Sequence, residues 1–179
     1  IYVGYKYYET RYQDQVLGLN NATGNYGVFA GDNGVWDYST EMAYPFGYGL
    51  SYSEFTEKLE SVTWENHQVK ATISVTNNGP KEGSNYKQDT AKHVVQLYVQ
   101  QPYEKGQAEK SAINLIGFDK VELKTGETKT VEIVADDYLF ASYDENAING
   151  SDTTKKGCYV LDAGDYHFAI GSSSHDALN

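Results

Sequence analysis

The sequence predicts an all-β fold, an antiparallel β-sandwich that runs from about residue 57 to residue 174. Short segments in which apolar and polar residues alternate recur about every 10 to 20 residues, and this alternation is typical of half-buried strands. Helical periodicity is almost absent, with only a single turn expected over 136–140. Regularly spaced strands without helices between them favour two packed sheets over alternating β and α units.

The clearest strand is expected over residues 69–76. Its odd-numbered positions are apolar and its even-numbered positions polar, so one face of the strand is predicted to be buried and the other exposed. Asn77–Pro80 follows with residues that favour turns, and the strand is therefore expected to end there.

Other strands are predicted from the same alternation, with Leu97 and Ile133 as the best core candidates. They are expected over 93–99, around Val121 and Leu123, and over 128–134, 158–161 and 166–170. Residues 124–127 predict a turn, and Ala163–Asp165 predicts a hairpin turn. Residues 53–61 have some helical character, but their second half is assigned to the first strand, in which Trp64 faces either the core or a domain interface.

The N-terminal residues differ from the rest. Residues 1–8 are aromatic-rich and predict a strand, which would be an exposed edge unless other strands paired with it. Residues 13–43 predict a long irregular loop, which is usually functional or packed on a partner. Two units are therefore expected: residues 1–54, a strand and linker loop of a neighbouring α/β domain, and residues 55–179, the sandwich. The chain is thus predicted to be a piece of a larger protein.

Composition excludes several classes of function. With 14 basic and 25 acidic residues, the formal net charge of −11 disfavours nucleic-acid and anionic-membrane partners, which need clustered Lys and Arg. No apolar run approaches the roughly 20 residues that span a bilayer. No leader peptide is visible. A soluble protein is expected, with the cytoplasm favoured slightly over secretion.

Cys158 and the 17 tyrosines each allow a structural and a functional interpretation. As the only cysteine, Cys158 cannot form an intramolecular disulfide, and its strand-like flanks predict a buried, inert thiol. Tyrosine rings can stack on sugars, but Tyr also suits half-buried strands, which is the simpler explanation of its abundance.

No complete catalytic or metal-binding centre is predicted. The carboxylates at 136–137, 144–145, 162 and 165 stand beside turn residues, where Asp forms local backbone hydrogen bonds, whereas glycoside hydrolysis needs two carboxyls with separated pKa values in one pocket. Scattered histidines and one cysteine do not make a zinc site, so no metal or cofactor is expected. Residues 172–176 contain Ser, His and Asp, but a polar chain end is the simpler interpretation.

Several motifs in order carry a family resemblance. Residues 1–10 (IYVGYKYYET) and 44–52 (YPFGYGLSY) look like the segments that, in family 3 glycoside hydrolases (the β-glucosidase family), end an α/β sandwich domain and lead into a fibronectin type III-like domain. The motifs VTNNG (75–79), VVQLYV (94–99) and LIGFDKVEL (115–123) follow in the family's order. Two departures are Lys6, where the family usually has Arg, and the length of residues 13–43.

The resemblance implies a fibronectin type III or immunoglobulin-like sandwich that is a non-catalytic accessory module of a retaining β-glucosidase-type enzyme. Its partners would be the catalytic domains of the same polypeptide and, through them, an oligosaccharide or β-glucoside. The family's nucleophilic Asp and acid/base Glu belong to parts that are absent here, and Glu9 matches neither, so no catalytic residue is carried over. Residues 173–179 look like the sandwich exit of bacterial relatives with a permuted domain order.

Aromatic residues near the start of the chain are the candidate site residues, either for a domain interface or for sugar stacking. They are Tyr5, Tyr7, Trp36, Tyr44, Phe46 and Tyr48. The alternative function is a free-standing carbohydrate-binding or adhesive sandwich, whose stacking platform would add Tyr26 and Tyr38 to the last four. An independent enzyme has the least support.

Overall fold

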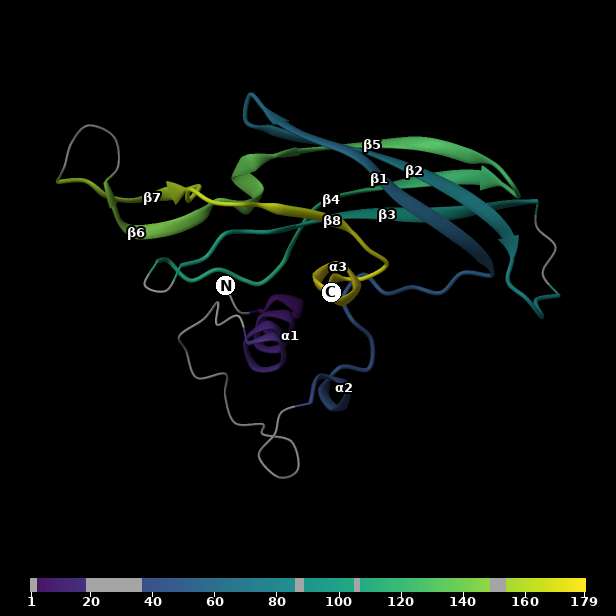
Figure 1. Ribbon diagram of the computed structural model, residues 1–179, viewed down its shortest axis with the longest axis horizontal. Coiled ribbons are helices and arrows are strands. Elements are labelled where there is room, and N and C mark those ends of the chain that lie inside the picture. The colour runs from purple at the N-terminus through teal and green to yellow at the C-terminus, as the bar shows by residue number, and fades with distance from the viewer. Residues whose placement is uncertain (1–2, 19–36, 86–88, 105–106, 149–153) are drawn as a thin grey trace.

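The computed structural model describes residues 3–18, 37–85, 89–104, 107–148 and 154–179. Within them, two three-stranded antiparallel sheets stack as a sandwich, with the orders β1–β2–β5 and β4–β3–β8, and a third antiparallel pair, β6–β7, projects beyond one end (Figure 1). The predicted all-β sandwich is confirmed. The strands are β1 (Ser53–Glu65), β2 (Gln68–Pro80), β3 (Thr90–Gln100), β4 (Asn114–Lys124), β5 (Thr128–Asp136), β6 (Ser142–Ile148), β7 (Lys156–Val160) and β8 (His167–Ile170).

Short helices lie on the outer side of the β4–β3–β8 sheet (Figure 1). They are α1 (Tyr5–Tyr12), which continues into a π-helical turn (Gln13–Leu17), α2 (Tyr38–Glu41) and α3 (Ser174–Leu178). A 3₁₀ helix (Asp137–Phe140) connects β5 to β6 where the sequence predicts a turn. It begins because Asp136 accepts a hydrogen bond from the backbone N–H of Tyr138 at 2.9 Å.

The main core fills the space between the two sheets. The alternating residues of β2 point into it as predicted, and Leu97 and Ile133 are buried there, which confirms both core predictions. Gly117 lets the sheets approach closely, because a Cβ at that position would collide with a side-chain methyl of Ile133. Trp64 lies at one end of this core and packs edge-on against Phe140.

A second, smaller core lies on the opposite face of β3. Tyr98 is fully buried there, together with Ala112 and Ile113 from the segment before β4 and Leu178 from α3. Since its neighbour Leu97 points into the main core, β3 is buried on both faces. Strands with that environment read as nearly continuous apolar runs, as Val94–Val99 does.

The strand predicted at the N-terminus is wrong, because the structure has an α-helix over Tyr5–Tyr12. Aromatic residues favour strands in general, but here the helix brings aromatic side chains into contact with the rest of the protein. Tyr5 and Tyr12 pack against the second core, and the hydroxyl of Tyr5 accepts a hydrogen bond from the backbone N–H of Leu115 at 2.9 Å. The Thr10 hydroxyl accepts another from the N–H of Ala112 at 2.8 Å. Tertiary contacts have overridden the local propensity.

Two predicted chain reversals also need correction. β2 continues through Asn77–Pro80, because the buried Asn77 side chain donates to the Leu123 carbonyl at 3.0 Å and accepts from the Gly79 N–H at 2.9 Å. Ala163–Asp165 does not close a hairpin, since β7 pairs with β6 whereas β8 pairs with β3 in the sandwich. Residues 53–61 are extended from Ser53 onward, without the helical character considered for their first half.

Three smaller expectations have definite outcomes. The turn at 124–127 is confirmed: the Gly126 N–H donates to the Asn77 carbonyl at 2.7 Å. Cys158 is partly exposed rather than buried, because β7 lies in the projecting pair and not in the sandwich. Among the described residues, no helix has both the length and the apolar character needed to cross a bilayer.

Leu97→Ala and Ile133→Ala are each expected to lower the free energy of unfolding by roughly 2–5 kcal/mol, because each opens a cavity in the main core. Urea denaturation followed by circular dichroism measures this cost. Val134→Ala is the matched control, because Val134 follows Ile133 on β5 but is half-exposed. Equal, small effects at all three positions would contradict the described strand orientation.

Candidate functional site

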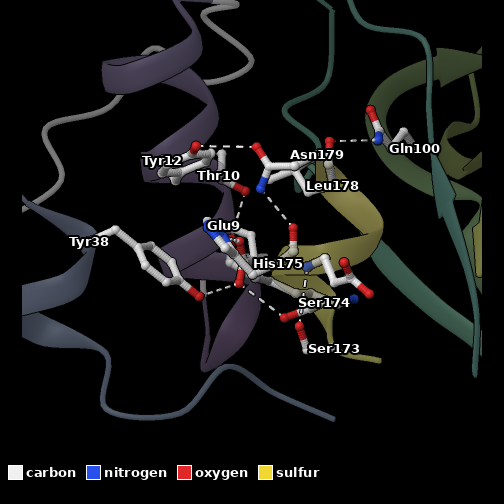
Figure 2. Close-up of polar contacts among 12 residues, drawn as sticks. Glu9, Thr10, Tyr12, Tyr38, Gln100, Ser173, Ser174, His175, Leu178 and Asn179 are labelled. Atoms are coloured by element: carbon white, nitrogen blue, oxygen red, sulfur yellow. Dashed lines mark hydrogen bonds and ion pairs between the residues drawn. The ribbon is translucent and has the colours of Figure 1, made fainter. Parts of the chain in front are cut away.

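The candidate site lies where the first and last helices meet over the outer face of β3. Its polar centre consists of Glu9 from α1, Tyr38 from α2, and Ser174 and His175 from α3, with Tyr12 beside them (Figure 2). We call these five residues the helix junction. The linker, residues 44–52, passes next to it and enters β1.

Glu9 is the centre of the helix junction, and its side chain is fully buried. Its Oε1 accepts hydrogen bonds from the Tyr38 hydroxyl at 2.6 Å and from Ser174 Oγ at 3.0 Å. Its Oε2 faces His175 Nδ1 at 2.9 Å, so that nitrogen carries a proton and donates. A buried carboxylate is stable only when it is paired and hydrogen-bonded. These donors therefore tie α1 to α2 and α3.

The sequence around α3 explains why Ser174 and His175 point at Glu9. Ser173 caps the helix by accepting the Asp176 N–H at 3.1 Å, and the Asp176 carboxylate accepts the Ser172 N–H at 2.8 Å. This reciprocal capping starts the helix at Ser174. The Ser-His-Asp run noted in the sequence thus begins a helix. The expected polar chain end needs correction, because Ser174 is buried and Leu178 packs into the second core.

Aromatic rings enclose the imidazole of the helix junction. Tyr38 stacks on His175 with ring centroids 4.1 Å apart, and Tyr12 contacts it edge-on at 4.5 Å. Burial, followed by the hydrogen bond to Glu9, raises the pKa of the Tyr38 phenol well above its ordinary value. Tyr38 therefore stays protonated and acts as a donor.

The linker is fastened to the sandwich beside this centre. The Phe46 carbonyl accepts the Ser174 N–H at 2.8 Å, and the Gly47 carbonyl accepts Gln96 Nε2 at 3.1 Å. The buried Tyr98 hydroxyl holds the Gln96 side chain by donating to its Oε1 at 2.7 Å. Gly47 has φ 86°, and a Cβ there would collide with Gln96 and Tyr98. This position therefore requires glycine.

A groove of about 750 Å³ runs between the linker and the outer face of β3 and β4. Its volume falls within the roughly 300–1,000 Å³ of ordinary ligand sites. Phe46 and Phe118 provide apolar walls, and Lys92 and His93 provide polar ones. His93 is held by Glu57, with 2.7 Å between Nε2 and Oε1. The groove can hold an apolar group with a few polar contacts.

The geometry of the helix junction does not support nucleophilic catalysis. In a catalytic triad the serine donates to the histidine, and the acid orients the other imidazole nitrogen. Here Ser174 donates to the acid itself and is fully buried. Both oxygens of Glu9 are occupied by donors from the protein. Among the described residues, no group of three or more His, Cys, Asp or Glu side chains could hold a metal ion.

The predicted site residues fall into separate places. Tyr5 stacks on Phe46 with ring centroids 4.4 Å apart, and Tyr44 stacks on Tyr48 at 5.2 Å. Tyr7 contacts Tyr8 edge-on with ring centroids 5.1 Å apart and accepts a hydrogen bond from Arg11 Nη1 at 3.1 Å. Two predicted residues, at 26 and 36, lie outside the described residues. Whether these rings serve a domain interface or sugar stacking stays a prediction.

The sequence did not indicate that the helix junction would form. Glu9 is separated from Tyr38 by 29 residues and from Ser174 by 165. No motif spacing connects them, because spacing rules describe neighbours on one element. The sequence placed Glu9 beside an aromatic-rich segment that was predicted to be a strand, and it predicted a polar chain end at residues 172–176, so neither segment was expected to form a helix.

Comparisons with known proteins agree on one family. Residues 93–174 match the fibronectin type III-like domain. The chain is 32% identical over 184 residues to probable β-glucosidase H of Emericella nidulans, covering 99% of this chain and 16% of that protein. It is 35% identical over 152 residues to the exo-α-(1→6)-L-arabinopyranosidase of Bifidobacterium longum, covering 84% of this chain and 17% of that protein.

Solved structures show the same likeness. A β-glucosidase from Paenibacillus barengoltzii superposes with a TM-score of 0.64 at 33% identity, over 98% of this chain and 15% of that one. β-Glucosidase 3B from Thermotoga neapolitana superposes with a TM-score of 0.64 at 27% identity, over 100% of this chain and 18% of that one. The chain therefore spans less than a fifth of the length of these relatives.

Gly47→Ala is expected to release the linker and to lower the free energy of unfolding by roughly 1–3 kcal/mol, because the new methyl forces Gln96 and Tyr98 apart. Limited proteolysis should then cut within residues 44–52 at lower protease concentrations. Gly49→Ala is the matched control, since a Cβ at Gly49 has no atom within 4 Å. Equal protease sensitivity of the two variants would contradict the proposed fastening.

Stability is expected to fall above about pH 10, the usual pKa of tyrosine. Because the folded state raises the pKa of Tyr38, it holds the phenol proton more tightly than the unfolded chain does. The resulting stability is complete below the unfolded pKa and is lost as the pH rises through the folded pKa. Tyr38→Phe cannot ionise, so its unfolding midpoint should fall less than that of wild type between about pH 9 and 11. Tyr44→Phe, at an exposed ring, should follow the wild type. Parallel pH profiles for all three would refute the role of Tyr38.

Proposed function

Because the chain belongs to the β-glucosidase family of family 3 glycoside hydrolases and carries its fibronectin type III-like domain, we propose that it serves as the non-catalytic accessory module that supports the catalytic domains of such an enzyme. The whole enzyme would hydrolyse O-glycosidic bonds of β-glucosides. Its partners are the catalytic domains of the same polypeptide and, through them, the glucoside substrate.

The observation that carries this proposal is that the linker is held in place yet exposes large apolar side chains. The backbone carbonyls of Phe46 and Gly47 accept hydrogen bonds from the Ser174 N–H and from the Gln96 side chain. Within the same segment, Tyr44, Leu50 and Tyr52 are 69%, 81% and 67% exposed. Exposed apolar patches mark interaction surfaces. A linker that is held in place and exposes apolar side chains suits docking against a neighbouring domain.

The chemistry of the helix junction supports the same conclusion. Glu9 is fully buried, and both of its carboxylate oxygens accept hydrogen bonds from side chains of this chain. Its contribution is to position α1 on the sandwich, since cleavage of a glycoside would need two accessible carboxyls with different pKa values. Catalytic carboxylates are therefore assigned to the other domains.

The sugar specificity of the whole enzyme is proposed from the names of its relatives. Probable β-glucosidases K and H of Emericella nidulans are among the similar proteins, and so is the arabinopyranosidase of Bifidobacterium longum. The module can therefore accompany different catalytic specificities. A cytoplasmic, soluble location is the preference drawn from the sequence, and cell fractionation would test it.

We expect the 179-residue chain alone not to hydrolyse 4-nitrophenyl β-D-glucopyranoside, whereas a longer polypeptide that adds the catalytic domains should do so. Release of nitrophenolate measures both rates. Turnover by the chain alone that disappears in Glu9→Gln would overturn the proposal and make Glu9 catalytic.

The docking role has its own test in the longer polypeptide. Leu50→Ser should lower its thermal midpoint while leaving the midpoint of the 179-residue chain unchanged, because Leu50 is exposed only in the isolated module. Val134→Ser, at another exposed apolar residue on β5, is the control. A midpoint of the longer protein that is insensitive to Leu50→Ser would mean that the linker face is not the docking surface.

A further inference from the structure

The projecting pair β6–β7 and the 3₁₀ helix that precedes it carry a second group of exposed aromatic rings, in addition to those of the linker. Tyr138, Tyr143 and Tyr159 are 58%, 56% and 53% exposed. Tyr138 and Tyr159 lie with ring centroids 4.7 Å apart, and Tyr143 contacts Tyr159 at 5.3 Å. We call these three residues the tyrosine platform. Figure 1 shows that β6 and β7 extend away from both sheets of the sandwich.

The backbone holds the tyrosine platform in place before any ligand arrives. Tyr143 and Tyr159 are directly opposed partners in the β6–β7 register. The Tyr143 side chain lies over the glycine at position 157, and a Cβ on that residue would collide with the Tyr143 phenol. Tyr138 is supplied by the 3₁₀ helix that enters β6. Rigid exposed aromatic side chains contribute contact area at a low entropic cost.

A cavity of about 230 Å³ opens at the base of the tyrosine platform. Its lining includes Tyr143 and Tyr159, the amides Gln101 and Asn114, and Lys6 from α1. This volume is below the roughly 300–1,000 Å³ of drug-sized sites. The cavity therefore suits a single ring rather than an extended ligand.

Amide groups give the cavity its hydrogen-bonding character. Gln101 Oε1 accepts from Ser142 Oγ at 3.3 Å, and Asn114 Oδ1 accepts from Ser111 Oγ at 2.9 Å. Within the described residues, the side-chain nitrogens of both amides form no hydrogen bond. Amides and hydroxyls can both donate and accept, as the hydroxyls of a neutral sugar do.

The charge around the cavity does not select an anion or a cation. Lys6 and Glu109 bring charges of opposite sign to its lining. The buried ammonium of Lys110 is neutralised by Asp162 at 2.6 Å. A neutral ligand with one apolar face and several hydroxyls matches the combination of tyrosine rings and amides.

We propose that the tyrosine platform and the cavity at its base form a binding site for a neutral pyranoside. The rings of Tyr143 and Tyr159 meet at 70°, so the sugar's C–H face stacks on one ring while the other contacts its edge, and its hydroxyls are bonded by Gln101 and Asn114. The location rests on geometry, and the choice of a sugar as ligand rests on the proposed function.

Nuclear magnetic resonance titration of the 179-residue chain with methyl β-D-glucopyranoside and with cellotetraose tests the proposal. We expect saturable shifts that cluster on residues 138–144 and 156–160. Tyr159→Ala and Tyr143→Ala should each weaken binding by about tenfold. Tyr52→Ala removes an exposed ring that is not among the candidate stacking residues and should leave the affinity unchanged.

Gln101→Leu provides a second test if an alanine variant does not fold, because it removes the amide without opening the core. It should weaken binding by a similar factor. Absence of saturable binding of both sugars, or equal affinity in Tyr159→Ala and wild type, would overturn the site. Self-association that Tyr159→Ala abolishes, without sugar binding, would identify the platform as a protein interface instead. None of these measurements involves turnover, so their failure would leave the accessory role untouched.

Discussion

The burial of both faces of β3 is the constraint on which the rest of the structure depends. Leu97 places one face in the core between the sheets, while Tyr98 places the other against the helices. Tyr98 also orients Gln96, which holds the linker at Gly47. One strand therefore joins the sandwich, the helix junction and the linker. A change on either face of β3 reaches both cores, so the N-terminal segment behaves as part of the sandwich's packing and not as an appendage to it.

The alternation of apolar and polar residues was enough to predict the sandwich, because each strand of the main core presents one face to it. The pattern identified the inward positions of β2 and the core roles of Leu97 and Ile133. It failed where contacts outside the local segment decide the structure. Tyr5 and Tyr12 have high strand propensity, yet the helix places both of them against the second core. Asn77 resembles a turn residue, but its buried side chain satisfies two backbone groups and keeps β2 extended.

The candidate sites were harder to predict than the fold. Glu9 meets His175 across 166 residues of sequence, and neither residue has a motif that names the other. The tyrosine platform was missed for a different reason: Asp144 and Glu145 resemble turn residues, so the strand β6 was not expected and the pairing of Tyr143 with Tyr159 was not apparent. Propensity describes single segments, whereas both sites are made by the pairing of two or more. Tyr44 and Phe46 could be proposed as candidates from the sequence because they share one short segment, and their role stays a prediction.

The contact between the first and last helices has a mechanical consequence. Since α1 and α3 lie side by side and share the carboxylate of Glu9, tension applied to chain segments attached before α1 and after α3 would act first on this contact. The strands of the sandwich would stay outside the path of the force until the helices separate. The hydrogen bonds around Glu9 would thus break before the sheets unfold. The sandwich would stay folded, and the helices could re-form their contact when the tension is removed.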